Sequence, residues 1–248
     1  MTAPEAPDVR PEPRPETPPP ARRRPGLRRW LSIALAAAVF LPLGGVVVHR
    51  FVPPLTTVLM VEQTFKGRPQ DYRWRSLDRI SPRLVRAAIA AEDANFCRHE
   101  GFDFEAIREA LDANADGRRM RGGSTISQQT AKNLFLWPGR DWVRKGLEAG
   151  YTVLIEAFWP KRRIMEVYLN VAEFAPGVYG AEAAARHWFG KSADELTARE
   201  AARLAAVLPS PRRYDAARPG PYVRRRAGRI QAAANTVARD GLDACVLR

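Results

Sequence analysis

An uncharged run near the N-terminus constrains this chain more than any other feature. The stretch WLSIALAAAVFLPLGGVVV extends from Trp30 to Val48 without one charged residue, and a helix needs roughly 20 such residues to cross a bilayer. A cleaved signal peptide and a buried core helix are the alternatives. The apolar part of a signal peptide is usually shorter, about 7–15 residues, and no clear small-x-small cleavage motif follows this run. We therefore predict an uncleaved transmembrane helix over residues 30–49.

The charges on either side of this run predict its orientation. Several arginines precede it, whereas only His49 and Arg50 follow it directly. Because positively charged flanks stay in the cytoplasm, we expect the N-terminus there and the rest of the chain on the outer side. Residues 1–29 are rich in proline and charge and poor in large apolar side chains, so we expect a disordered cytoplasmic tail.

The rest of the chain is predicted to be mainly α-helical. Helical patterns with short polar breaks extend over residues 80–240, and runs of alternating β-branched residues are scarce. We expect residues 50–79 to form an entry segment, in which TTVLMVEQTF is a short strand or an extended piece. Residues 241–248 are expected to form a C-terminal tail.

Cysteines and histidines are few and far apart. Cys97 and Cys245 are the two cysteines, and a widely separated pair does not define a disulfide framework. They have the option of pairing in an exported domain, but we expect Cys97 to be a small packed residue and Cys245 to lie in a loose tail. The three histidines are too far apart in sequence to indicate a structural zinc site.

Two acids close the first apolar helix of the exported part, in AAEDANFCRHEGFD. Glu92 continues the apolar face of that helix, whereas Asp93 shares a face with Arg86 and is expected to meet solvent. A carboxylate held against apolar surface has a raised pKa, which suits it to accept a proton. The alternative is a helix-end glutamate that bonds to a neighbouring backbone N–H group or an arginine. The apolar face consists of Val85, Ala88, Ile89 and Phe96.

A second polar region follows in RGGSTISQQTAKNLFL. Thr125 and Gln128 fit a capping box, so a helix begins directly after a glycine turn, and such helix ends favour anions. With Gln129 and Lys132 they form a polar stripe suited to a sugar and a phosphate, or simply the wet side of an amphipathic helix. The large apolar residues of Leu134–Trp137 either reach into a membrane interface or pack beneath the helix.

The third region, GRDWVRKGLEAG, combines positive charge with one carboxylate. We expect Asp141 to cap a helix whose apolar residues Val143, Leu147, Leu154 and Phe158 share a face. Glu148 lies three and four residues after two basic side chains, which indicates either a surface ion pair worth only ~0.3–0.5 kcal/mol or a functional cationic cluster held by a carboxylate. The cluster consists of Arg140, Arg144 and Lys145.

Taken together, five stretches resemble the motifs of the peptidoglycan glycosyltransferases, in the family's order. They are EDANFCRHEGFD, GGSTISQQTAKN, RKGLE, KRRIMEVYLN and GVYGAEAAARHWFGK. The resemblance covers about residues 84–214 and is strongest to the monofunctional, membrane-anchored biosynthetic branch. It implies a lysozyme-like helical glycosyltransferase domain with a larger lobe and a smaller lobe near the membrane, behind one N-terminal transmembrane helix.

The resemblance also implies the chemistry. The substrate is the undecaprenyl-pyrophosphoryl disaccharide-peptide, lipid II, and the product is a linear glycan strand. Glu92 matches the general base and Glu148 the second carboxylate, and a divalent cation (Mg²⁺ or Mn²⁺) is an additional candidate beside the pyrophosphate. The location is the inner membrane, with the catalytic domain in the periplasm. The substrate-binding positions implied are Phe96, His99, Ser124, Thr125, Gln128, Gln129, Lys132, Asn133, Arg140, Arg144 and Lys145.

Other classes of function fit the sequence less well. A lysozyme-like hydrolase has no use for the cationic cluster, and a non-catalytic scaffold has no need of Glu92, Lys132 and Glu148 together. The net charge of +13 is expected to attract anionic lipid and pyrophosphate, since a nucleic-acid partner requires a cytoplasmic domain. No S-x-x-K and no K-T-G motif is present, so we expect no transpeptidase activity. Crosslinking is then left to a separate transpeptidase or to division and elongation proteins.

Overall fold

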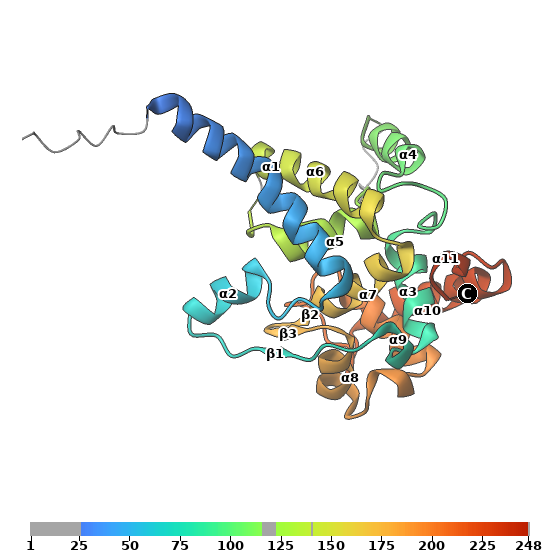
Figure 1. The fold of residues 1–248 in the computed structure, drawn as a ribbon. Helices are drawn as coiled ribbons and strands as arrows, with labels where there is room; N and C mark the ends of the chain where they lie inside the picture. Colours follow the sequence, from blue (N-terminus) through green and yellow to red (C-terminus); the bar gives the residue numbers. More distant parts are fainter. Residues whose placement is uncertain (1–25, 116–122, 140, 248) are drawn as a thin grey trace, which may run out of the picture. The chain divides into compact units, whose positions relative to one another are not determined.

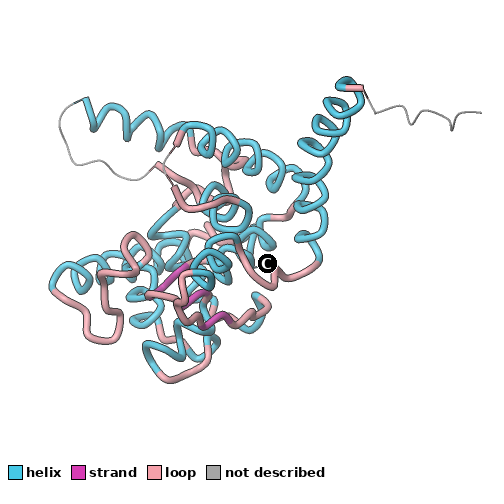
Figure 2. The backbone as a smooth tube through the Cα atoms, turned by 90° about the vertical axis from the view of Figure 1, so that its left-hand side faces the viewer, coloured by secondary structure: helices cyan, strands magenta, loops and turns pink. Residues whose placement is uncertain are grey.

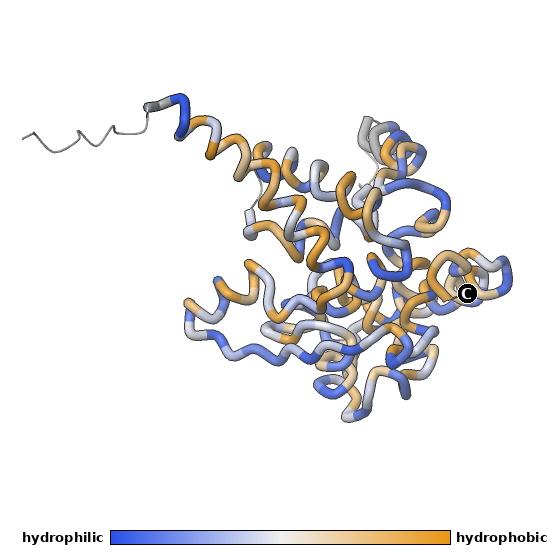
Figure 3. The backbone as a smooth tube through the Cα atoms, viewed as in Figure 1, coloured by the Kyte–Doolittle hydropathy of each residue, from blue (hydrophilic) through white to orange (hydrophobic). Residues whose placement is uncertain are grey.

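The computed structural model describes residues 26–115, 123–139 and 141–247, in two units. The first unit ends at Phe40 and the second begins at Leu41. Helix α1 (Leu27–Phe51) starts in the first unit and ends in the second, and Figure 3 shows the apolar residues along it. Its stretch Arg28–Phe51 is long and apolar enough to cross a membrane, as the sequence predicts.

The second unit is built almost wholly of helices (Figure 1), which confirms the predicted fold class. Two short 3₁₀ turns, Leu77–Arg79 and Ala193–Glu195, join some of them. The helices are α2 (Val58–Phe65), α3 (Pro82–Glu92), α4 (Phe104–Ala115), α5 (Ile126–Phe135), α6 (Trp142–Phe158), α7 (Lys161–Val171), α8 (Ala181–Phe189), α9 (Ala198–Val207), α10 (Pro221–Arg239) and α11 (Ala244–Leu247).

A small three-stranded sheet joins the entry segment to the segment after α7 (Figure 2). Strand β1 (Asp71–Tyr72) pairs in parallel with β3 (Val178–Tyr179), which is antiparallel to β2 (Glu173–Ala175). Gly177 turns the chain between β2 and β3 at a φ of +74°, where a Cβ atom would come within 2.5 Å of the carbonyl oxygen of Pro69. Only glycine fits such a turn without strain.

The expected strand or extended piece in TTVLMVEQTF is wrong. This segment forms helix α2, in which the side chain of Thr57 accepts a hydrogen bond from the backbone N–H of Met60. Met60 and Gln63 are buried one turn apart, so packing of a helical face overrides the β-branched composition.

Two groups of helices form the core of the second unit. Helices α3, α9 and α10 pack against one another, and α5 packs against α6 and α7. Small side chains allow the close approach of α9: Ala201, Ala202, Ala205 and Ala206 are all buried. Hydrogen bonds from α5 and α10 meet at Glu92, the last residue of α3.

In helix α6 charged side chains are buried and several large apolar side chains are exposed, the reverse of an ordinary amphipathic helix. Asp141 caps it as predicted, accepting a hydrogen bond from the backbone N–H of Arg144 at 2.8 Å. Most of the predicted apolar face does not face the core, however: Val143, Leu147 and Phe158 are exposed, and only Leu154 is partly buried against the core. The buried residues of α6 are Arg144, Glu148, Thr152 and Ile155. Helical spacing finds a stripe, but it does not say whether protein or another apolar medium covers it.

The last turns of α1 belong to the second unit. Val46 is fully buried, and its carbonyl oxygen accepts a hydrogen bond from Nε1 of Trp159 at 2.8 Å. The carbonyl oxygen of His49 accepts hydrogen bonds from Nε and Nη2 of Arg163, at 3.0 and 2.8 Å. The end of the apolar helix is therefore fixed to the junction of α6 and α7.

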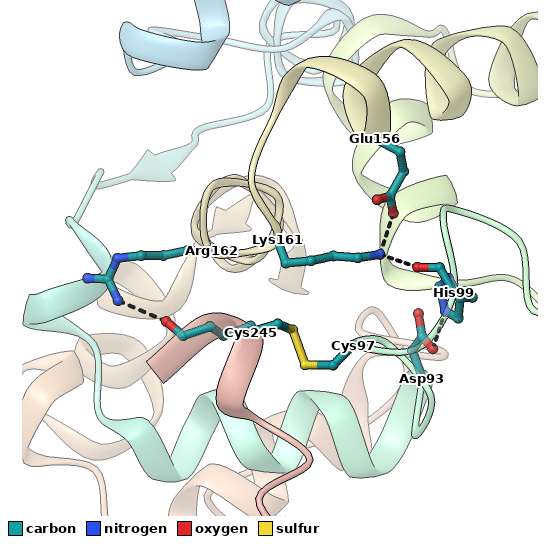
Figure 4. Close-up of a disulfide and its surroundings, with 8 residues drawn as sticks. Asp93, Cys97, His99, Glu156, Lys161, Arg162 and Cys245 are labelled. Atoms are coloured by element: carbon teal, nitrogen blue, oxygen red, sulfur yellow. Dashed lines mark hydrogen bonds and ion pairs between the residues drawn. A yellow bond between two sulfur atoms is a disulfide. The ribbon is translucent and has the colours of Figure 1, made fainter. Parts of the chain in front are cut away.

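Cys97 and Cys245 form a disulfide with a Cα–Cα distance of 5.6 Å (Figure 4). The expectation of a loose tail around Cys245 is therefore wrong. Nε of Arg86 also contacts Asp243 at 2.6 Å, and Nη1 of Arg162 donates to the carbonyl oxygen of Val246 at 2.9 Å. The disulfide spans 148 residues, and closing so long a loop stabilises a fold by typically about 2–4 kcal/mol. Contacts made only in the folded chain draw the two cysteines together.

Candidate active site

Glu92 ends α3 at the meeting point of three helices. Its side chain is 14% exposed, and the predicted apolar neighbours beneath it are buried. Nε2 of Gln129 on α5 donates to Oε2 at 3.0 Å, and Nη2 of Arg226 on α10 donates to Oε1 at 3.2 Å. Burial raises the pKa of Glu92, while the hydrogen bond from Gln129 and the positive charges of Arg226 and Lys132 oppose that shift. A carboxylate in this setting is suited to accept a proton near neutral pH.

Tyr168 of α7 lies close to this carboxylate. Its side chain is fully buried and its hydroxyl has no hydrogen-bond partner among the described residues. Burial raises the pKa of Tyr168 well above the ordinary value, and the negative charges of Glu92 and Asp93 add to the shift. The phenol is therefore a neutral neighbour of the site.

The expectation that Asp93 faces solvent is wrong. Asp93 is the C-cap residue of α3, and its backbone is no longer helical. Its carboxylate is therefore directed away from the expected helix face and is buried. Oδ1 contacts Nε2 of His99 at 2.8 Å (Figure 4). Oδ2 accepts the backbone N–H of Ile126 at 2.9 Å. Since Nδ1 of His99 accepts a hydrogen bond from the N–H of Gly101, the ring hydrogen is on Nε2, which donates a hydrogen bond to Asp93. Helical spacing alone cannot place a residue whose backbone has stopped being helical.

The N-terminus of α5 shows the predicted capping box. Thr125 accepts the N–H of Gln128, and the side chain of Gln128 accepts the N–H of Thr125. Oγ1 of Thr125 also donates to the carbonyl oxygen of Gly101 at 2.6 Å. Both side chains are buried and engaged, and the anion at this helix end is Asp93. The Thr125–Gln128 part of the stripe is therefore not a wet surface.

A cavity of about 310 Å³ is lined by residues of α5, α6 and α7, among others, and Glu92 is not one of its lining residues. Gln129 borders this cavity and also bonds to Glu92, so the carboxylate and the cavity are neighbours. Burial lowers the pKa of Lys132, and the negative charge of Glu148 opposes that shift. Polar lining residues include Gln129, Lys132, Asn133, Arg144 and Glu173.

Glu148 organises the positive charges on the α6 side. It is 3% exposed, and it pairs with Nη1 of Arg144 at 3.1 Å and with Nζ of Lys145 at 2.6 Å. Ion pairs within α6 are therefore present, as one of the two alternatives predicts, but their carboxylate is buried and not on the surface. Within the part of the chain that the structure describes, Nε of Arg144 is buried without a hydrogen-bond partner, and the Arg144 side chain also borders the cavity.

Comparison with known proteins decides the family. The transglycosylase family profile matches residues 59–236. The chain belongs to the transglycosylase family. Similar proteins, each called a biosynthetic peptidoglycan transglycosylase, include one from Caulobacter vibrioides, 56% identical over 89% of this chain and 96% of the relative. Another from Rhodospirillum centenum is 54% identical over 90% and 97%, and one from Xanthomonas campestris pv. campestris is 53% identical over 90% and 93%. The predicted membership of the peptidoglycan glycosyltransferases is confirmed, and the protein is an enzyme.

The remaining expected site positions of this transglycosylase differ in their surroundings. Phe96 is fully buried, with Nζ of Lys161 4.6 Å from its ring centroid, and His99 is bonded to Asp93, so both lie behind the site rather than in its cavity. Ser124 is exposed at the start of α5. Arg140 lies outside the described residues.

For the apolar segment Leu134–Trp137 the sequence predicts either packing beneath the helix or insertion into a membrane interface, and its residues differ in this respect. Leu134 and Leu136 are buried, whereas Trp137 is 42% exposed. Packing accounts for the leucines, and Trp137 borders the cavity.

In the described parts of this transglycosylase, the candidate ligands are a poor fit to a divalent cation. Glu148 is paired with two cations, and Glu173 with Arg212 at 3.2 Å. Asp93, His99 and Asp103 lie close enough together to suggest a site. Their donor atoms are already hydrogen-bonded to one another, to Asn95 or to backbone N–H groups. We therefore derive no step through a metal.

Proposed function

We propose that this enzyme polymerises lipid II into linear β-1,4-linked glycan strands with inversion at the anomeric carbon, releasing undecaprenyl pyrophosphate. One observation carries the proposal: Glu92, a largely buried carboxylate with a raised pKa, is joined through Gln129 to a cavity lined by Lys132 and Arg144. The first group suits a hydroxyl that must lose a proton, and the second suits a pyrophosphate that must leave.

In the proposed reaction Glu92 takes the proton of the acceptor's 4-hydroxyl group as that oxygen attacks the anomeric carbon of the donor. The bond from this carbon to the pyrophosphate oxygen breaks on the opposite face, so the α linkage is replaced by a β linkage. The electron pair leaves with the pyrophosphate, and the positive charges of Lys132 and Arg144 stabilise it. Glu92 then returns its proton to solvent.

Glu148 is proposed to act through the cations that it holds. Its two oxygens are paired with Arg144 and Lys145, so it fixes their side chains toward the donor side before substrate arrives. Such preorganisation spares the transition state the cost of reorganising charged groups.

The proposal is tested by incubating the purified full chain in detergent with labelled lipid II. We expect long strands that a muramidase cuts to disaccharide-peptides, with the peptide stems not crosslinked. Binding without strands supports the scaffold alternative, and cleavage of preformed glycan supports the hydrolase alternative. Crosslinked product contradicts the expectation, from the absent S-x-x-K and K-T-G motifs, that a separate transpeptidase is needed.

Membrane lipid is the second proposed partner. The outward face of α6 carries Trp142, 91% exposed, and Val143, 71% exposed. The end of α1, which is fixed to the α6–α7 junction, adds Phe51 at 73%. An apolar surface of this kind is suited to lie in a bilayer interface, where it keeps the site close to the lipid tail of the substrate.

Trp142→Asp combined with Val143→Asp is expected to lower polymerisation about tenfold in liposomes and to leave it nearly unchanged in detergent, because detergent removes the need to dock on a bilayer. Strand formation in the two media measures this ratio. Tyr222→Asp makes a comparable aromatic-to-acid change at an exposed position of α10, 41% exposed, and is the matched control. Equal losses in both media would contradict a role in membrane contact.

The disulfide supports the proposed orientation, with the catalytic domain in the periplasm. Disulfides persist in oxidising compartments and are rare in the cytosol. In wild-type cells lysed into denaturant, Cys97 and Cys245 are expected to react with a maleimide only after reduction. Cys245→Ser leaves Cys97 unpaired and is expected to react at once. Free thiols in the wild type would place the domain in the cytoplasm.

A further inference from the structure

Arg226 lies where a charged residue is unexpected. Helix α10 packs against α3 and α9, and its face toward the core includes Val223, Ala227 and Ile230, all buried. Arg226 falls on this apolar face, and its side chain is 22% exposed. Arginine is rarely placed on a core-facing stripe without a charged partner.

That partner is the carboxylate of Glu92. Nη2 of Arg226 donates to Oε1 at 3.2 Å, while Nε2 of Gln129 donates to Oε2 at 3.0 Å. Each carboxylate oxygen accepts about two hydrogen bonds, so one donor on each oxygen fixes the carboxylate and leaves it able to accept a further proton. The two donors come from two different helices, α10 and α5.

We propose that Arg226 is a positioning residue for Glu92, holding the carboxylate ionised and oriented for proton transfer. This rests on the proposed function, in which Glu92 is the base. The contact of Arg226 is with Glu92, so we expect Arg226 to act on the rate of proton transfer through Glu92 rather than on binding of the donor. The assignment extends the site to the C-terminal helix.

Other charged or titratable groups also face Glu92 and shape its titration. Lys132 comes from α5, Tyr168 from α7, and Asp93 follows Glu92 directly. The positive charge of Lys132 opposes the burial effect, as that of Arg226 does, while the negative charge of Asp93 adds to it. Removal of Arg226 therefore leaves burial less opposed.

Arg226→Gln tests the assignment through the pH profile of strand formation from lipid II. We expect the acid limb of kcat to move upward by about one pH unit, since a nearby opposite charge lowers a carboxyl pKa by about 1–3 units. At pH values well below the acid limb, kcat of Arg226→Gln is then expected to be about tenfold lower than kcat of the wild type at the same pH. KM for lipid II is expected to be unchanged. Arg226→Lys keeps the charge and is expected to restore the limb. Arg229→Gln, the same change on an exposed arginine of α10, is expected to match the wild type.

Three outcomes separate the proposals. An unmoved acid limb in Arg226→Gln, in an enzyme that polymerises and requires Glu92, overturns the role of Arg226 alone. A wild type that makes no strands overturns the proposed function itself. If Arg226→Gln does not fold, Arg226→Lys decides: its less directional ammonium should lower kcat at every pH without changing KM, and an unchanged kcat overturns the assignment.

Discussion

Glu92→Gln is expected to lower the rate of strand formation by about 10²–10⁴-fold while leaving lipid II bound. A general base contributes a factor of this size, and glutamine keeps the shape of the side chain but cannot accept the proton. The hydrogen bond to Gln129 and the contact with Arg226 both end on this side chain, so an amide preserves most of the packing. Strand length and rate from labelled lipid II, with binding measured on the same samples, report the result.

The pH dependence gives Glu92 a signature of its own. Burial raises the pKa of Glu92, and the ionised form is the base. Activity is therefore present above this raised pKa and is lost as the pH falls through it, at a higher pH than an ordinary glutamate would give. Glu92→Gln should abolish this limb together with the rate.

Glu100→Gln supplies the matched control for Glu92. It makes the same chemical change eight residues later, at an exposed position of the same motif. We expect wild-type rate and profile. If Glu92→Gln polymerises as fast as this control, Glu92 is not the base.

The sequence locates Glu92 because a helix repeats regularly. Val85, Ala88 and Ile89 define a buried face of α3, and the spacing of Glu92 puts it on that face, as the structure confirms. Phe96 is buried as well, but it lies beyond the end of the helix and not on its face. The same reasoning applied to α10 would have found Arg226 among Val223, Ala227 and Ile230, so this signal was present but unused. The capping box of Thr125 and Gln128 is equally local, and it too is confirmed.

What the sequence could not give depends on long-range contacts. Asp93 turns inward because the first N–H group of α5, 33 residues later, needs an acceptor. Cys97 and Cys245 meet because α11 packs against α7 and Asp243, just before α11, pairs with Arg86 of α3. The exposed apolar face of α6 misleads for another reason, since periodicity reports the stripe and not the medium that covers it.

Lys132→Met is expected to lower kcat about 10²–10³-fold, the usual cost of removing one preorganised electrostatic contact to a transition state. Lys132 borders the cavity and lies near both Glu148 and Glu92, which is where the proposed reaction requires a positive charge for the leaving pyrophosphate. Lys66→Met removes an equal charge from a side chain that is 52% exposed and should leave kcat unchanged.

The stability of the Lys132→Met variant separates catalysis from folding. Burial lowers the pKa of Lys132, which means that the folded protein disfavours its charged form. Methionine of similar length removes that penalty, so we expect the melting temperature of Lys132→Met to stay level or to rise while kcat falls. A lower melting temperature together with lower kcat would instead indicate that Lys132 holds the fold.

The alkaline limb of the rate profile identifies the group that stabilises the leaving pyrophosphate. The charged form of Lys132 is the active one, so activity is present below its lowered pKa and is lost as the pH rises through it. Arginine stays protonated throughout this range, so Lys132→Arg should be slower than the wild type but should lack the alkaline limb. If the limb persists in Lys132→Arg, another group controls it. If Lys132→Met raises KM and leaves kcat intact, Lys132 holds the pyrophosphate equally well in the bound substrate and in the transition state, and the driving force for its departure must come from Arg144.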